Sequence, residues 1–396
     1  MSDDELLRKL KRQSRLIHSG RSSTDGRSVN PVLERASTYL YRTVGAMRAV
    51  EATRETDRYP RVYGRRGTAT TFSLEDALVD LERGHGARIL SSGLSANVLA
   101  FQAVLSAGDH VVVSDGIYGP VRRYVATVLK RCGVEYDFCR ADGQGIEALI
   151  RPNTRLIYFE VPGAALFELA DLPRLAVVAR EANAILAVDN TWASGWLCHP
   201  IELGADISIL SATKYLNGHS DVLLGAVVAN ERAWGAVNNM AELTGAAASP
   251  DDSYQVLRGL RTLAVRMKSH EDQARALIDW FEKQSFVRRV YYPGLSQHPG
   301  HEIWRRDFRG ANGLFSVEFA EDISDADACH FIDALSLFGI GSSWGGYESL
   351  VRLENSKSLR SLSAAPLGPI VRFHAGLEDI VDLIDDLSAA SQTLNG

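Results

Sequence analysis

Two apolar runs in this chain of 396 residues each end in a polar group suited to catalysis. The run ILAVD (185–189) ends on Asp189, and the run ISILSATK (207–214) ends on two hydroxyls and the amine of Lys214. Ligands of parallel α/β sheets bind beyond the carboxyl ends of the strands, so both groups are expected at one functional edge. A lone lysine is more often a solvated surface charge, however, and an Asp with a Lys at one edge can simply form an ion pair.

Further groups near the same edge favour a bound cofactor. The stretch SGL (92–94), between a predicted strand and a helix, offers backbone N–H groups at a helix N-terminus, where a dianion is favoured. Ser211 and Thr213 add hydroxyl donors, and Tyr118 offers an aromatic face. Alone, a Ser-Gly pair is usually only a turn, and a tyrosine that caps a core looks the same as one that stacks on a ligand. Together with a lysine amine and a carboxylate, these are the groups that pyridoxal phosphate requires.

The elements that must position these residues alternate between short β-rich runs and amphipathic segments of helical length. Strands are predicted at 87–90, 110–114, 134–138, 155–159, 185–188, 207–210 and 222–228, and helices at 95–105, 120–131 and 173–181. Strands separated by helices indicate a mostly parallel sheet covered on both faces. We therefore predict an α/β domain at 61–255.

Two further regions flank this domain. Residues 1–60 have few periodic apolar positions, and the Gly/Ser-rich stretch at 19–28 predicts an N-terminal arm, of the kind that often wraps a neighbouring subunit. Beyond residue 249 the pattern changes to a long helix at 258–283, strands at 287–292, 314–319 and 370–373, and a last helix at 377–387. This pattern predicts a smaller C-terminal α+β domain at 256–396.

The composition argues against several classes of function. The net charge is -6, the pI is near 6.0 and Lys and Arg are scattered, so no nucleic-acid partner is expected. The N-terminus is charged and no apolar run is long enough to cross a bilayer, so we expect a cytoplasmic protein without a membrane partner. The 4 cysteines form no CxxC pair, so neither a disulfide framework nor a metal site is expected.

Several stretches form a specific combination by their order and spacing. They are YGRRGT (63–68), VDNTW (188–192), SATKYL (211–216), GHSD (218–221), RGLRT (258–262), GHEIWRRD (300–307), SWGGYES (343–349) and RFHAGLED (372–379). In these stretches, which extend over nearly the whole chain, the sequence resembles the Cys/Met-metabolism family of pyridoxal-phosphate enzymes, and within it the bacterial cystathionine β-lyases. The resemblance implies pyridoxal-phosphate fold type I, with a mostly parallel central sheet and a smaller C-terminal domain.

The resemblance also implies a role for each matching position. Lys214 matches the lysine that holds the cofactor and moves protons, and Asp189 matches the partner of the pyridine nitrogen. Tyr118 is expected to stack on the cofactor ring and to help deprotonate the incoming amine. Arg372 matches the arginine that clamps the substrate α-carboxylate in a two-bond fork, which a lysine cannot copy. The near half of the phosphate site would consist of Gly93, Leu94, Ser211 and Thr213.

Two further sets of positions match parts of the family's shared active site. Tyr63 and Arg65 match a tyrosine and an arginine that reach the phosphate of a neighbouring subunit, which implies a homo-oligomer with shared sites, expected to be a tetramer. Ser343, Trp344 and Tyr347 belong to the loop that shapes the distal side of the substrate pocket. The Trp-Gly-Gly-Tyr sequence of this loop resembles that of the β-lyases.

The expected reaction is the α,β-elimination of L-cystathionine to homocysteine, pyruvate and ammonia. Where the bacterial β-lyases read ESPGS, however, this chain reads EVPGA (160–164), so Val161 and Ala164 replace two hydroxyls. A γ-lyase, or a lyase specialised for an O-substituted homoserine or a related nonprotein amino acid, is therefore the alternative. An NAD or nucleotide enzyme is disfavoured because no GxGxxG or P-loop is present, and a cofactor-free binding module would be expected to lose the lysine, the aspartate or the arginine.

Overall fold

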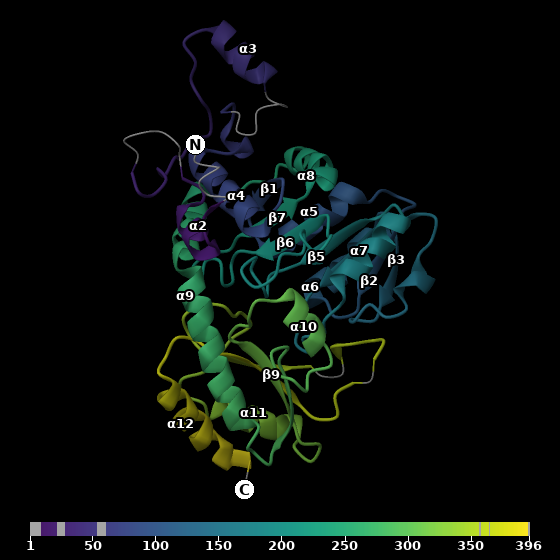
Figure 1. Ribbon diagram of the computed structural model, residues 1–396, viewed down its shortest axis with the longest axis vertical. Helices are drawn as coiled ribbons and strands as arrows, with labels where there is room; N and C mark the ends of the chain where they lie inside the picture. Colours follow the sequence, from purple (N-terminus) through teal and green to yellow (C-terminus); the bar gives the residue numbers. More distant parts are fainter. Residues whose placement is uncertain (1–8, 22–27, 54–60, 356–357, 364, 395–396) are drawn as a thin grey trace.

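The computed structural model describes residues 9–21, 28–53, 61–355, 358–363 and 365–394. Figure 1 shows a larger part built on a seven-stranded sheet and a smaller part built on a five-stranded sheet, with helix α9 (Pro250–Phe281) running from one to the other. The sequence predicted this helix only from residue 258. It begins earlier because Pro250 occupies the first turn and the Ser249 hydroxyl caps the free N–H groups of Asp251 and Asp252.

The seven-stranded sheet confirms the predicted mostly parallel α/β arrangement. Its spatial order is β1-β7-β6-β5-β4-β2-β3, and within the described chain β7 alone runs antiparallel to its neighbours. The strands are β1 (Gly86–Leu90), β2 (His110–Ser114), β3 (Glu135–Cys139), β4 (Thr154–Glu160), β5 (Ile185–Asp189), β6 (Ile207–Ser211) and β7 (Gly225–Ala229). The strand predicted at 222–228 starts later, because Leu224 pairs with Thr213 in the loop that carries Lys214.

Helices cover both faces of this sheet, which is why its strands are apolar on both sides. On one face lie α5 (Gly93–Val104), α6 (Gly119–Tyr124), its π-helical continuation η2 (Val125–Leu129) and α8 (Glu231–Leu243). On the other face lie α4 (Ala69–Glu82), α7 (Leu172–Glu181) and part of α9. Successive residues of a strand point to opposite faces, so Tyr158 packs in the first layer and Phe159 in the second.

The smaller part is the predicted α+β unit, with a largely antiparallel sheet. Its order is β10-β11-β12-β9-β8, in which only the β10–β11 pair is parallel in the described chain. The strands are β8 (Val287–Tyr291), β9 (Leu314–Phe319), β10 (Gly339–Ile340), β11 (Leu350–Glu354) and β12 (Ile370–His374), and the helices are α10 (His301–Asp307), α11 (Asp325–Asp333) and α12 (Ile380–Ser391). Strands β10 and β11 were not predicted from the sequence.

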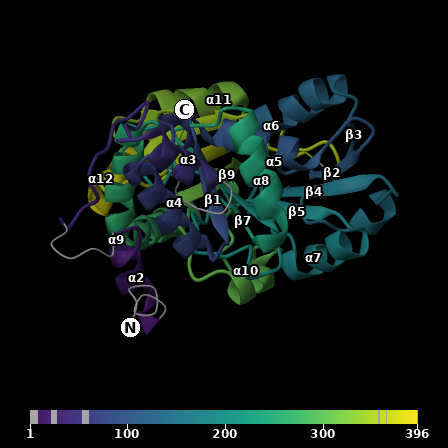
Figure 2. The ribbon, with the colours of Figure 1, turned by 90° about the horizontal axis from the view of Figure 1, so that it is seen from above.

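The N-terminal region carries two short helices, α2 (Arg12–His18) and α3 (Val44–Ala52). α2 lies beside α9 in both views (Figures 1 and 2), where Arg261 donates to the carbonyl oxygen of Leu16 at 2.8 Å. α3 contains no buried residue and stands away from the rest of the described chain in Figure 1. None of the helices described is long and apolar enough to span a membrane.

Candidate active site

Asp189 is the last residue of β5 and is 5% exposed. Its Oδ1 accepts a hydrogen bond from the backbone N–H of Thr191 (3.0 Å), and its Oδ2 accepts one from Nδ2 of Asn97 (3.0 Å). Burial raises the pKa of Asp189 above its usual range, while the bonds from Thr191 and Asn97 act in the opposite direction. The result is a buried carboxylate whose orientation is fixed by one donor on each oxygen.

Lys214 lies in the loop after β6. The loop is held by Thr213, whose Oγ1 accepts from the backbone N–H of Leu224 at 3.0 Å. Nζ of Lys214 donates to Oγ of Ser343 at 2.7 Å and lies 5.3 Å from the centre of the Trp344 ring. Burial, and after it the charge of Arg372, lowers the pKa of Lys214 to about 8. A larger neutral fraction than that of a surface lysine makes this amine a better nucleophile and proton acceptor.

The segments that carry Asp189 and Lys214 lie side by side, as the sequence predicted. β5 and β6 are parallel neighbours, with Asp189 in register with Ile209. Beyond the strand ends, the backbone N–H of Ser211 donates to Oγ1 of Thr191 at 2.8 Å. This bond joins the turn after Asp189 to the turn before Lys214, so the carboxylate and the amine share one edge of the sheet.

The N-terminus of α5 opens at the same edge. Ser92 caps the helix by accepting the N–H of Ser95 at 3.2 Å, while the first N–H groups of any α-helix, here those of Gly93 and Leu94, have no partner within the helix. A Cβ on Gly93 would lie 2.6 Å from the Ser211 side chain, so only glycine allows the two to approach this closely. The turn and the Ser211 hydroxyl therefore form one small cradle with donors for an anion.

Arg372 extends from β12 of the smaller part toward this edge. Its Nη1 lies 3.1 Å from Oε1 of Glu354, and its Nη2 donates to the carbonyl oxygen of Ser342 at 3.2 Å. Tyr118 caps the N-terminus of α6, its ring is half-exposed, and its backbone N–H donates to Glu160 at 2.6 Å. Arg372 contacts Ser342 and Lys214 contacts the next residue, Ser343, so the guanidinium and the amine lie at one site.

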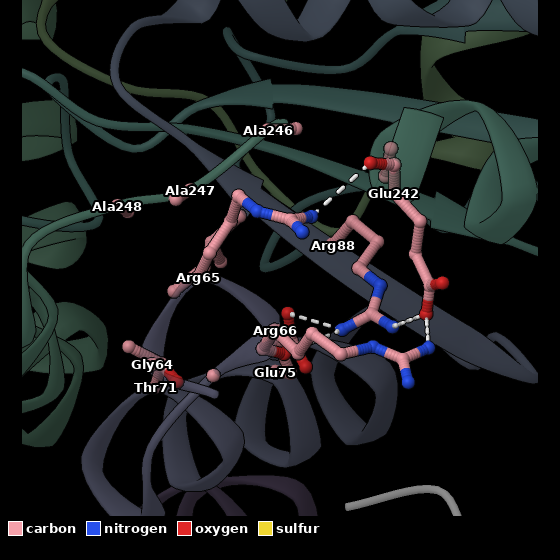
Figure 3. Close-up of a pocket in the computed structure, with 13 residues that line it drawn as sticks. Gly64, Arg65, Arg66, Thr71, Glu75, Arg88, Glu242, Ala246, Ala247 and Ala248 are labelled. Atoms are coloured by element: carbon pink, nitrogen blue, oxygen red, sulfur yellow. Dashed lines mark hydrogen bonds and ion pairs between the residues drawn. The ribbon is translucent and has the colours of Figure 1, made fainter. Parts of the chain in front are cut away.

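Arg65 lines a different pocket of the same chain, shown in Figure 3, and Tyr63 lies two residues before it. Arg65 Nη1 donates to the carbonyl oxygen of Glu242 at 3.2 Å, and the residues that line this pocket do not include Lys214 or Asp189. The ring of Tyr63 is 47% exposed and lies 5.8 Å from the Arg65 guanidinium. Their action in a neighbouring subunit stays a prediction.

The loop that follows β10 divides into two parts. Ser343 and Trp344 lie next to Lys214, and Trp344 also packs on the ring of Tyr215 at 5.5 Å. The ring of Tyr347 is 56% exposed, so the part it takes in the pocket stays a prediction.

Sequence reasoning missed three residues that touch this site, namely Asn97, Tyr158 and Glu354. Asn97 had a detectable signal, since helical spacing puts it on the buried face of α5 between Gly93 and Phe101, where a polar side chain needs a reason. Glu354 lies on β11, a strand that the sequence did not predict, and pairs with Arg372 on the predicted strand β12, so nothing in its neighbourhood along the chain marks it.

The groups collected here fit pyridoxal phosphate. The amine of Lys214 matches its aldehyde, the buried carboxylate of Asp189 matches its pyridine nitrogen, and the cradle of Gly93 and Ser211 at a helix N-terminus matches its phosphate. The cradle is too tight for any side chain at Gly93, which favours the backbone donors that a phosphate dianion takes.

Comparison with known proteins agrees with this fit. The model of the Cys/Met metabolism PLP-dependent enzymes matches residues 13–392. A cystathionine beta-lyase of Bordetella avium is 40% identical over 370 residues, with 93% of each chain covered, and the cystathionine beta-lyase MetC of Escherichia coli is 37% identical with 96% of this chain and 98% of the relative covered. The solved cystathionine gamma-lyase of Lactobacillus plantarum, in complex with L-serine, superposes with a TM-score of 0.88 at 28% identity, covering 98% of this chain and 100% of that one. The chain therefore belongs to the family of pyridoxal-phosphate-dependent enzymes of cysteine and methionine metabolism.

Proposed function

We propose that this enzyme cleaves the Cβ–S bond of L-cystathionine and, with water, releases homocysteine, pyruvate and ammonia. The observation that carries the proposal is the position of the Trp344 ring, 5.3 Å from Nζ of Lys214. A bulky ring beside the amine shortens the space beyond Cβ, which favours departure of a group from Cβ over departure from Cγ. The two bacterial relatives named as cystathionine beta-lyases support the same reaction.

Lys214 holds the cofactor and then moves the protons of the reaction. Pyridoxal phosphate, when bound, supplies an electron sink for the electron pair left at Cα. The amine of Lys214 takes the proton from Cα, a step that needs its neutral form and is helped by a pKa near 8. The same amine delivers a proton to the sulfur as the Cβ–S bond breaks, so the leaving group departs as a neutral thiol.

Asp189 and the α5 cradle hold the two polar ends of the cofactor. The carboxylate of Asp189 would accept a hydrogen bond from the protonated pyridine nitrogen and so keep that nitrogen protonated. The N–H groups of Gly93 and Leu94 bind the phosphate together with the hydroxyls of Ser211 and Thr213.

Arg372 and Tyr118 bind and prepare the substrate. Arg372 forms a two-bond fork with the α-carboxylate, which fixes the position of the Cα proton relative to Lys214. The half-exposed ring of Tyr118 would stack on the flat cofactor, and its phenolic oxygen, in the phenolate form, would take a proton from the incoming amine. Ser343, which contacts the amine of Lys214, orients that amine toward the reacting carbon.

The active sites are completed by a second copy of the chain. Tyr63 and Arg65 contribute to the phosphate site of a neighbouring subunit in a homotetramer. The half-exposed Tyr63 and the absence of any buried residue in α3 support the proposal, since both leave surface that a second copy of the chain can cover. Because cofactor and substrate are cytoplasmic metabolites, we propose that the enzyme acts in the cytoplasm.

One observation favours γ-elimination instead. Val161 is buried, and Ala164 is held by its backbone, with its N–H donating to Gly116 and its carbonyl accepting from Arg360 at 2.8 Å. Neither side chain offers a hydroxyl, and this difference from the β-lyase motif is the reason to propose, as the alternative, a lyase for an O-substituted homoserine or a related nonprotein amino acid.

The products distinguish the two reactions. Purified holoenzyme is incubated with L-cystathionine and with a panel of O-substituted serines and homoserines, and the keto acids are separated by chromatography. β-Elimination yields pyruvate, whereas γ-elimination yields 2-oxobutyrate. We expect pyruvate to dominate, and we expect Trp344→Ala to raise the share of 2-oxobutyrate. A dominant four-carbon keto acid from the unaltered enzyme contradicts the β-lyase assignment, and the ratio does not depend on how much enzyme is active.

A further inference from the structure

A short chain of hydrogen bonds runs through the buried layer beneath Asp189. The hydroxyl of Tyr158 in β4 donates to Oδ1 of Asn97 in α5 at 2.6 Å. Nδ2 of Asn97 donates to Oδ2 of Asp189 at 3.0 Å and to the carbonyl oxygen of Gly93 at 3.1 Å. These side chains are almost fully buried, with exposures of 0% for Tyr158, 3% for Asn97 and 5% for Asp189.

The direction of every bond in this chain is fixed by chemistry. The carboxylate of Asp189 and the carbonyl of Gly93 only accept, so both must face the amide nitrogen of Asn97. The amide oxygen then faces Tyr158, whose hydroxyl must donate. Burial raises the pKa of Tyr158 well above its usual range, which keeps that donor protonated. The bonds from Tyr158 to Asn97 and from Asn97 to Asp189 therefore donate in the same direction, toward the carboxylate, while the second N–H of the Asn97 amide is taken by Gly93.

These hydrogen bonds are unusual because apolar side chains surround them. Tyr158 packs on the ring of Phe101 at 4.8 Å within an apolar cluster that also contains Val113 and Ile209. An apolar pair at positions 97 and 158 would fill such a layer without the free-energy penalty of burying an amide and a phenol. The polar pair therefore points to a task at the carboxylate it contacts.

A second carboxyl group lies beside Asp189, so the hydrogen bonds to Asp189 can influence which of the two carboxyl groups carries the negative charge. Glu160 ends β4 in register with Asp189 on β5, so two carboxyl groups meet at the same edge of the sheet. Burial, and after it the charge of Asp189, raises the pKa of Glu160 well above its usual range. A buried carboxyl group and a partly buried one beside it hold one negative charge more easily than two, and the side-chain amide of Asn97 bonds to Asp189.

We propose that Asn97 and Tyr158 are positioning residues, which orient the carboxylate of Asp189 toward the pyridine nitrogen and keep the negative charge on Asp189 rather than on Glu160. The proposal rests on the role proposed above for Asp189. Asn97 acts directly through its bond to Oδ2, whereas Tyr158 acts through Asn97 by holding the amide in one orientation. The two substitutions should therefore differ in size and should not be additive.

The test uses holoenzyme loaded with cofactor labelled with ¹⁵N in the pyridine ring. The ¹⁵N chemical shift reports protonation of that nitrogen directly, and the dissociation constant of the cofactor is measured alongside. Asn97→Leu removes a bond to a charged group, so kcat should fall by about ten- to a hundredfold while KM changes little. Tyr158→Phe removes a neutral bond and should lower kcat by about two- to tenfold. Both variants should shift the ¹⁵N signal toward the unprotonated form and lower the affinity for the cofactor.

The matched control is Tyr292→Phe, which also removes a fully buried hydroxyl, one that donates to the carbonyl of Asn312 at 2.9 Å. Its ¹⁵N shift should equal that of the unaltered enzyme. In the double variant, adding Tyr158→Phe to Asn97→Leu should cause no further change. Thermal unfolding identifies any variant that fails to fold, and Tyr158→Phe keeps the ring and its packing.

The variant Asp189→Asn separates the proposed role of Asp189 from the positioning role of Asn97 and Tyr158. If Asp189→Asn shifts the ¹⁵N signal but Asn97→Leu and Tyr158→Phe leave it and the cofactor affinity unchanged, the positioning role is wrong and the role of Asp189 stands. If Asp189→Asn leaves the signal unchanged, the proposed role of Asp189 fails, and the positioning role fails with it.

Discussion

The guanidinium of Arg372 is ion-paired with Glu354, with 3.1 Å between Nη1 and Oε1, and the side chains are only 13% and 11% exposed. The two residues come from β12 and β11, which are antiparallel neighbours in the smaller sheet. The residue proposed to bind the substrate carboxylate is thus already paired with a carboxylate of its own. An entering amino acid adds a second negative charge to this pair, so Glu354 opposes substrate binding while it stabilises the free enzyme.

Glu354→Gln should therefore lower KM for the substrate. Removing one partner of a buried ion pair leaves the other uncompensated and destabilises the unbound enzyme. The substrate carboxylate then restores the lost partner, and we expect KM to fall by about three- to tenfold, which corresponds to roughly 0.7–1.4 kcal/mol. Steady-state kinetics measures this change, and Tm without substrate should be lower than that of the unaltered enzyme.

The matched variant is Arg372→Lys, which keeps the charge but loses the fork. Its KM should rise by about ten- to a hundredfold with the affinity for the cofactor unchanged, because a point charge cannot reproduce two parallel bonds. An unchanged KM in Arg372→Lys would show that the carboxylate binds elsewhere.

The rate at which the apoenzyme binds the cofactor should depend on pH, because the amine of Lys214 must be neutral to react. Only the neutral amine attacks an aldehyde, and burial together with Arg372 lowers the pKa of Lys214 from 10.5 to about 8. The initial rate, followed by absorbance, should therefore rise with pH and level off above an inflection near 8. Arg372→Met should move the inflection to higher pH, since a charge that disfavours the protonated amine is lost, while Arg372→Lys should not. The same inflection in Arg372→Met and in the unaltered protein would contradict this assignment.

Hybrid oligomers test whether Tyr63 and Arg65 act across subunits. Lys214→Ala and Arg65→Ala homo-oligomers should each be inactive or nearly so. After subunit exchange, a mixed pair contains one site with both residues intact, so activity should return to about a quarter of the unaltered level at equal mixing, from random pairing. Exchange verified by mass spectrometry with no gain in activity would place Arg65 in the site of its own chain or in none.

That Asp189 and Lys214 lie at one edge of the sheet could be predicted from the sequence because that information is local. Asp189 and Lys214 each follow a short apolar run, and in a parallel sheet the carboxyl ends of neighbouring strands meet at one edge. The glycine after Ser92 and the hydroxyl of Ser211 were predicted as phosphate donors for the same reason, and they lie in contact.

Residues that act through distant partners were beyond sequence reasoning. Helical spacing marks Asn97 as a buried polar residue, but its partners cannot be predicted along the chain, since the bond from Asn97 to Asp189 spans 92 positions and the bond from Tyr158 to Asn97 spans 61. Glu354 depends on the pairing of β11 with β12, and β11 alternates too weakly in burial to be predicted as a strand.

The direction of strand β7 also could not be predicted from the sequence. β7 is buried along its whole length, like the parallel strand β2 of the same sheet, so its reversal leaves no trace in the hydrophobic pattern. The late start of β7 comes from the pairing of Leu224 with Thr213, a tertiary contact that holds the Lys214 loop.

The most direct test of the account is to find the lysine that holds the cofactor. Holoenzyme is reduced with borohydride, digested, and mapped by mass spectrometry. The cofactor mass should be fixed on Lys214, and Lys214→Ala should neither retain the mass nor turn over substrate. Lys268→Ala, the control at an exposed lysine, should retain the mass and turn over substrate normally. Cofactor fixed on another lysine, or normal turnover by Lys214→Ala, would contradict the central claim.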